Sequence, residues 1–198
     1  MLAISLAFVG CVGGKVKYPT YYTLQVPPAP DPPAFETAHM ALAVREFTSP
    51  GYLRQGAIVY RVSPEQIGFY DYHRWAMNPR EFVTNAVIDR LRTSGTFANV
   101  KLYDGRSDVD YILSGRLEKL EELDYGGSVR VEVAMSAQIT NVKTGTLAWT
   151  NAIDHIEKVE QHSVAGIVSE MDRAMEQGIG KLVSSVHIPQ VVNSERQP

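Results

Sequence analysis

The feature that most constrains the fold of this chain is a period-two pattern in residues 128–142, SVRVEVAMSAQITNV. The apolar members of the pattern are Val129, Val131, Val133, Met135, Ala137 and Ile139. Because successive side chains of a β-strand point to opposite faces, this pattern predicts a long strand with one buried face and one solvated face.

Turn signals on both sides place this strand in the middle of a meander. The run DYILSGRLEKLEEL is followed by the turn DYGG, which leads into residues 128–142. After the pattern, NVKTGT turns the chain back into the run from Leu147 to Val159. We therefore predict three long antiparallel strands that share one buried face.

The first half of the chain holds shorter β-rich runs, at residues 21–26, 40–47, 57–62, 66–72 and 99–104. Of these, 57–62 and 66–72 are expected to form a hairpin. The sequence PPAPDPP at 27–33 has five prolines and predicts a stiff connector across the surface. A ligand for a proline-recognition module is the alternative.

The first helix is predicted from its capping residues. Asn78 is suited to the N-cap position, Pro79 to the first helical position and Glu81 to a capping box, while Gly95 is expected to end the helix. Between these residues, apolar side chains recur at i, i+4 and i+8, at Val83, Val87 and Leu91. One face of this helix is therefore expected to pack on the sheet.

The second helix is expected to begin after Ser163 and to end before Pro189. Its apolar stripe comprises Val164, Ile167, Val168, Met171, Met175, Ile179, Leu182, Val183 and Val186. Gly178 and Gly180 within it mark either a close packing contact or a local break. Together these elements predict an α+β fold: a single domain with an antiparallel or mixed β-sheet, two helices packed on one face, and the other face free to meet a partner.

The N-terminus indicates where the protein acts. Leu2 to Gly10 form an apolar run that is too short to span a membrane, and Cys11 follows it as the one cysteine of the chain. The stretch LAFVGC resembles a bacterial lipoprotein signal, in which the cysteine is diacylated, although Phe8 stands where such signals usually have Leu and no basic residue precedes the run. Either the true start lies upstream or Met1 is internal. A buried segment with a packed core cysteine is the alternative interpretation.

This hypothesis divides the chain into four parts. Residues 1–10 are expected to be a signal peptide, 11–20 the lipidated cysteine and a tether, 21–190 the folded domain and 191–198 a tail. Two or more acyl chains would anchor the protein stably, where one would bind only weakly. Val12 after the cysteine predicts sorting to the outer membrane.

The sequence offers little reactive chemistry. It has no Gly-x-Ser-x-Gly elbow, and KTG at 143–145 is expected to be a turn. The five histidines, at 39, 73, 155, 162 and 187, include no i, i+4 pair and have no cysteine partners, so no zinc site is predicted, and neither is a cofactor. Asp108, Asp110, Glu121 and Glu122 are interpreted as solvated. The net charge of −3 offers no continuous positive surface for nucleic acid.

The segment FYDYHRWAMNPREFV, residues 69–83, is the one place where polar and aromatic groups gather. Asp71, His73 and Arg74 could form a catalytic constellation there. Strand alternation would, however, send Asp71 to one face and the neighbouring tyrosines to the other. We therefore predict a structural joint in which Tyr72 and Trp75 fill the space between hairpin and helix.

The longer run from Ile58 to Val100, IVYRVSPEQIGFYDYHRWAMNPREFVTNAVIDRLRTSGTFANV, resembles the ABC-type transport auxiliary lipoprotein family, which includes PqiC-like proteins. The residues that carry the resemblance include Tyr60, Tyr70, Tyr72, Trp75 and Pro79, and the last four are our candidates for structural or interaction roles. YYTLQVPP before this run, and the meander and closing helix after it, follow the same plan.

The resemblance implies a non-enzymatic, periplasm-facing lipoprotein. Its partners would be an ABC permease and ATPase and a substrate-binding protein of the mammalian-cell-entry type, in the transport of lipid or hydrophobic solutes. Two hypotheses follow: an accessory docking module that uses the uncovered sheet face or edge, or a homo-oligomeric envelope lipoprotein that does not handle the substrate. An enzyme built around Asp71 and His73 is the third hypothesis.

Overall fold

The predicted meander forms the three longest strands of the sheet, with the last of them at one edge. The computed structural model describes residues 16–25, 39–106 and 108–188. In it β6 (Tyr111–Tyr125), β7 (Ser128–Asn141) and β8 (Leu147–Lys158) are consecutive antiparallel neighbours. Gly126 and Gly127 form the first hairpin turn with positive φ angles of 74° and 81°, a conformation that glycine adopts without strain.

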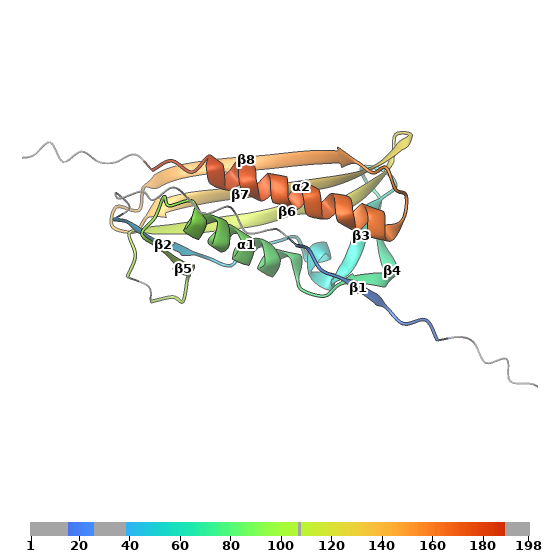
Figure 1. Ribbon diagram of the computed structural model, residues 1–198, viewed down its shortest axis with the longest axis horizontal. Coiled ribbons are helices and arrows are strands. Elements are labelled where there is room, and N and C mark those ends of the chain that lie inside the picture. Colours follow the sequence, from blue (N-terminus) through green and yellow to red (C-terminus); the bar gives the residue numbers. More distant parts are fainter. Residues whose placement is uncertain (1–15, 26–38, 107, 189–198) are drawn as a thin grey trace, which may run out of the picture.

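Beyond β6 the sheet divides into two short arms (Figure 1). The first arm is β2 (Ala41–Val44), parallel to the beginning of β6, with β5 (Asn99–Leu102) parallel to β2. The second arm is β3 (Ala57–Arg61), parallel to the end of β6, followed by β4 (Ile67–Trp75) and β1 (Thr20–Tyr22). β3 and β4 are antiparallel, as the predicted hairpin requires, and β1 is parallel to β4. The sheet is therefore mixed.

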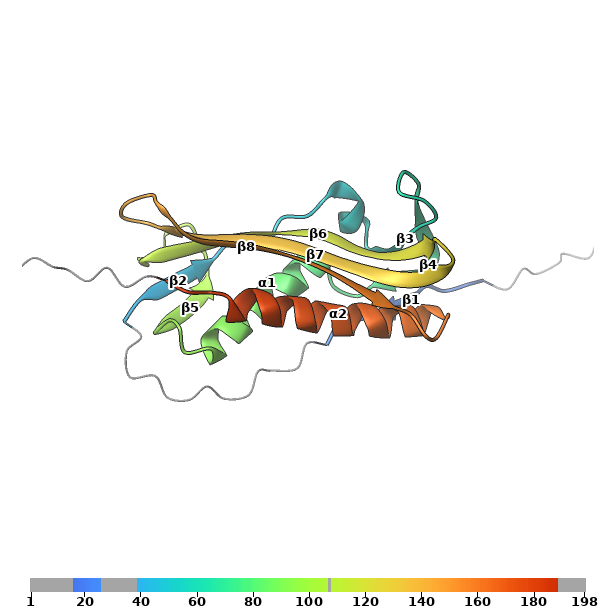
Figure 2. The same ribbon diagram turned by 90° about the horizontal axis from the view of Figure 1, so that it is seen from above.

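Both α-helices cover the same face of this sheet, as predicted (Figure 2). α1 (Pro79–Thr93) buries Val83, Val87 and Leu91, and α2 (Val164–Ser184) runs along the meander. α2 is continuous through Gly178, where a β-carbon would lie 3.4 Å from the Met135 methyl group. Of the two predicted meanings of this glycine, the close packing contact is the one observed.

Most of the observed helix caps are the residues that we predicted from the sequence. The Asn78 side chain accepts a hydrogen bond from the Arg80 amide at 3.2 Å, and Pro79 is the first helical residue. Ser94, rather than Gly95, is the C-cap of α1, and Gly95 follows it with a φ of 68°. Ser163 caps α2 by accepting a hydrogen bond from the Gly166 amide at 3.1 Å.

On the other side of the sheet, the 3-10 helix η1 (Gly51–Gln55) lies against β6 (Figure 2). Its Leu53 side chain is buried, and the Tyr52 hydroxyl donates to the Glu118 carbonyl at 3.2 Å. Most of the meander on this side has no helix over it. The expectations for Leu2–Gly10, Cys11, the proline run at 27–33 and Pro189 fall outside the described residues.

Candidate docking surface

The face of the meander that lies opposite the two α-helices carries mostly polar side chains. Cross-strand partners on this face include Ser114 with Gln138 and Gln138 with Thr150. We call this surface, formed by the outward side chains of β6, β7 and β8, the helix-free face. Because alternate residues of each strand share a face, its polarity follows directly from the period-two pattern.

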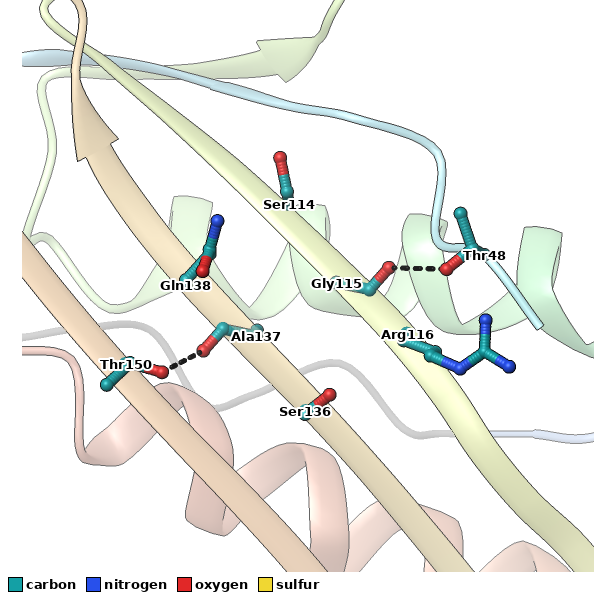
Figure 3. Close-up of a pocket in the computed structure, with 8 residues that line it drawn as sticks. All are labelled: Thr48, Ser114, Gly115, Arg116, Ser136, Ala137, Gln138 and Thr150. Carbon is teal, nitrogen blue, oxygen red and sulfur yellow. Dashed lines mark hydrogen bonds between the residues drawn. The ribbon is translucent and has the colours of Figure 1, made fainter. Parts of the chain in front are cut away.

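A shallow hollow of about 250 Å³ lies on the helix-free face (Figure 3). It is lined by Thr48, Ser114, Gly115, Arg116, Ser136, Ala137, Gln138 and Thr150. The Thr48 hydroxyl donates to the Gly115 carbonyl at 3.4 Å, and the Thr150 hydroxyl donates to the Ala137 carbonyl at 3.3 Å. Hydroxyl and amide groups of this kind offer hydrogen bonds to a partner surface.

Farther along the same face, two buried carboxylates stand opposite each other. Glu121 on β6 and Glu132 on β7 are cross-strand partners with exposed fractions of 0% and 6%. Arg61 pairs with Glu121 at 2.5 Å, and Lys119 pairs with Glu132 at 2.6 Å. The hydrogen bond to Glu121 raises the pKa of Arg61, and the one to Glu132 raises the pKa of Lys119.

These two ion pairs allow the neighbouring carboxylates of Glu121 and Glu132 to be buried side by side. Each carboxylate loses its hydration on burial, and its cationic partner offsets that loss. Our sequence interpretation of Glu121 and Glu122 as solvated was wrong. Both are buried, on opposite faces of β6. A signal was available in the sequence: two consecutive glutamates in the middle of a strand cannot both point to its solvated face.

The second gathering of functional candidates is the joint at residues 69–83. The Tyr70 hydroxyl donates to Glu122 at 2.7 Å, and burial raises the pKa of both groups. The hydrogen bond from Tyr70 opposes this shift in Glu122 by lowering its pKa. His73 pairs with the Tyr22 hydroxyl at 3.1 Å, across the β1 and β4 strands.

The strand alternation that we assumed for this segment does not hold. Val59 pairs with Phe69 and Ala57 pairs with Arg74, so β4 contains a bulge over residues 70–73. The rings of Tyr70 and His73 therefore meet at 5.7 Å instead of diverging.

Asp71, His73 and Arg74 nevertheless do not converge on one site. His73 pairs with Tyr22, Arg74 donates to the Gln55 carbonyl at 2.7 Å, and Asp71 is exposed. The described residues contain no group of three or more potential ligands that could hold a metal ion.

The predicted filling of the joint is half right. Trp75 is 6% exposed and fills it, and Pro79 is buried at the start of α1. Tyr72 was wrongly placed there: it is 45% exposed, with the Lys17 ammonium 5.5 Å from its ring centroid. The bulge in β4 is the reason, because it shifts the register of the side chains between Phe69 and Arg74.

Comparison with known families decides what kind of protein carries these surfaces. The model of the ABC-type transport auxiliary lipoprotein component matches residues 22–181. The chain belongs to this family. An auxiliary lipoprotein of this kind is associated with an ABC transport system and with the cell envelope. Among the described residues, the helices are too short or too polar to span a membrane.

Solved structures show that the fold is shared. Protein XCC0632 from Xanthomonas campestris matches with a TM-score of 0.72 at 18% identity, over 83% of this chain and 92% of that one. An uncharacterized protein matches with a TM-score of 0.67 at 14% identity, over 86% and 99%. The hypothetical protein CT253 from Chlamydia trachomatis matches with a TM-score of 0.51 at 7% identity, over 74% and 95%. A search of the curated proteins found no match.

Proposed function

We propose that this auxiliary lipoprotein is a non-enzymatic docking component of an ABC transport system for lipids or hydrophobic solutes, and that it acts beside a substrate-binding protein of the mammalian-cell-entry type. The observation that carries the proposal is the helix-free face. It leaves most of the polar side of three long strands without a helix over it, in a family whose members assist a transporter.

The chemistry of this face suits contact with a protein. The hollow offers hydroxyl and amide groups, and Arg116 in its lining forms an ion pair at 2.7 Å with Glu118, with both groups partly exposed. Such groups pair readily with a polar partner surface, and their dehydration is offset by the hydrogen bonds they form. Because these groups are polar, the face can be exposed to water when no partner is bound.

The proposal includes a lipid anchor at Cys11, which would hold the domain at the outer membrane with the docking face in the periplasm. Support comes from the apolar run before Cys11 and from the lipoprotein family. The segment from Val12 to Thr20 would serve as the tether. Intact mass of the membrane-extracted protein tests this: a diacylglycerol shift should be present in the wild type and absent from Cys11→Ala.

The docking role is tested by affinity extraction of the tagged lipoprotein from detergent-solubilised envelopes. We expect wild type to recover ABC transporter components and a Gln138→Arg/Thr150→Arg variant to lose them. The matched control is Ser169→Arg/Gln177→Arg, which changes exposed residues of α2 on the opposite side of the molecule. Recovery of no transport component by wild type would contradict the proposal.

The alternative is a homo-oligomeric envelope lipoprotein that supports the membrane without handling substrate. One observation favours it: among the described residues β8 pairs with β7 alone, so a strand of 12 residues has an unpaired edge that a second copy could use. Native mass spectrometry with lipid extraction separates the two roles. Oligomers free of phospholipid favour the scaffold, and co-purified phospholipid favours transport.

A further inference from the structure

Exposed apolar side chains are concentrated around the β1 edge of the sheet. Val16, Tyr18 and Tyr21 belong to the N-terminal segment, while Tyr72 lies on β4 and Met77 follows it. We call these five residues the β1-edge patch. Exposed apolar side chains that gather at one edge of a fold mark a contact site. A backbone hydrogen bond of 2.8 Å from the Ala76 amide to the Tyr22 carbonyl holds the two segments together.

An apolar groove of about 250 Å³ lies beside the patch. It is lined by Tyr22, Thr23, Leu24, Trp75, Met77 and Phe82, so Met77 belongs both to the patch and to the groove. Tyr21 and Tyr22 are consecutive strand residues and point to opposite sides of the sheet. The apolar surface therefore continues around the β1 edge. The indole nitrogen of Trp75 is buried there without a hydrogen-bond partner in the structure.

The composition of the patch matches a membrane–water interface. Tyrosine places an apolar ring beside a hydroxyl, and lysine can extend its ammonium group to the headgroups while its stem lies on apolar surface. The Lys17 ammonium, 5.5 Å from the Tyr72 ring centroid, brings these two features together.

The position of the patch in the chain points to the bilayer as its occupant. Val16 follows Cys11 by five residues, a segment that reaches at most about 18 Å when fully extended. The opposite end of the sheet lies farther away, because the 14 residues of β7 alone span about 45 Å. A bilayer that holds the acylated cysteine is therefore kept close to the β1 edge, whereas the far end of the sheet has no such short link to the anchor.

We propose that the β1-edge patch rests in the headgroup region of the bilayer that holds the anchor. This inference rests on the proposed lipidation of Cys11. Because β1 and β8 are at opposite edges of the strand order, contact through β1 holds β8 away from the membrane. The helix-free face then extends away from the membrane surface and remains accessible to a transport partner.

The test uses acylated protein in vesicles of phosphatidylethanolamine and phosphatidylglycerol that carry nitroxide labels on their headgroups, which quench nearby tryptophan. In a Trp149→Phe background, Trp75 reports on the groove. We expect strong quenching of Trp75 and loss of most of it in Tyr18→Ser/Tyr21→Ser/Met77→Ser. The matched control, Leu102→Ser/Val142→Ser/Leu147→Ser, removes three exposed apolar residues at the far end and should keep the quenching.

Trp149 provides an internal reference, since it hydrogen-bonds to the Ser185 carbonyl at the far end of α2. In a Trp75→Phe background its emission should not be quenched. If the tryptophan substitutions disturb folding, a nitroxide on Met77→Cys reports the same contact by its depth in the bilayer. Acylation occupies the thiol of Cys11, so the introduced cysteine is the one free thiol.

The outcomes distinguish the bilayer contact of the β1-edge patch from the lipid anchor at Cys11. An acylated protein whose Trp75 is unquenched, or equally quenched in the patch and control variants, overturns the bilayer contact and leaves the anchor in place. A protein without an acyl group overturns the anchor, and with it the reason for placing a bilayer at this edge.

Discussion

The two faces of β7 show how one strand serves two purposes. Toward the helices it presents Val131, Val133 and Met135, which are buried against the core. Toward the helix-free face it presents Ser136 and Gln138. The first set stabilises the domain by removing apolar surface from water, whereas the second set leaves polar groups for a partner. Alternate residues of β7 therefore serve different purposes: one set stabilises the core, and the other is available for contact with a partner.

The largest expected effect comes from the exception to this division, the buried carboxylates on the helix-free face. Arg61→Met leaves Glu121 buried without its cation, which should lower the free energy of unfolding by about 3–5 kcal/mol. Urea denaturation measures this loss.

Two variants serve as controls for Arg61. Arg61→Met/Glu121→Met should recover much of the stability, because neither charge then remains buried alone. Arg116→Met, next to the partly exposed Glu118, should cost less than about 1 kcal/mol. Equal losses for the Arg61 and Arg116 variants would show that Glu121 does not depend on its partner.

The second prediction compares neighbouring residues of β7 directly. Ile139→Ala removes a fully buried side chain and should lower the free energy of unfolding by about 2–5 kcal/mol. Gln138→Ala, one residue earlier and exposed, should change it by less than about 0.5 kcal/mol. Urea denaturation of both variants at one pH gives the comparison, and similar losses would contradict the assignment of roles to the two faces.

The third effect is smaller and depends on pH. Burial raises the pKa of Glu122, so the folded state holds this proton more tightly than the unfolded chain does. The stabilisation from protonated Glu122 is present below the ordinary pKa of a glutamate and is lost as the pH rises through the raised value. Glu122→Gln keeps an acceptor for Tyr70 and cannot ionise, so it should be more stable than wild type at pH 7.

Urea denaturation at pH 5 and pH 7 checks this prediction. The difference in stability between Glu122→Gln and wild type should grow toward pH 7. Glu118→Gln is the control at a partly exposed position and should show a much smaller change. If the stability of the wild type instead increased relative to that of Glu122→Gln as the pH rises, the pKa of Glu122 would be lowered in the folded state and the prediction would be wrong.

Much of the fold could be predicted because its signals are local. The period-two pattern of β7, the hairpin turns on both sides of it, and the caps at Asn78 and Ser163 each depend on neighbouring residues. The parallel pairings of β2 with β5 and of β1 with β4 join distant segments, and nothing local specifies them. The division of the sheet into two arms could therefore not be predicted from local sequence patterns.

The candidate sites divide in the same way. The polarity of the helix-free face follows from the residues between the apolar positions of β7, and the sequence indicated an uncovered face. The bulge in β4 could not be predicted, and it determines that Tyr70 reaches Glu122 while Tyr72 is exposed. The burial of Glu121 depends on Arg61, which lies 60 residues away in the sequence.

Photo-crosslinking in intact envelopes tests the central claim most directly. A crosslinking residue replaces Gln138 on the helix-free face or, as the matched control, Gln177 on the exposed side of α2. We predict that the probe at position 138 captures a component of the ABC transport system and that the probe at position 177 does not. Capture from position 177 with none from position 138 would contradict the docking role of the helix-free face.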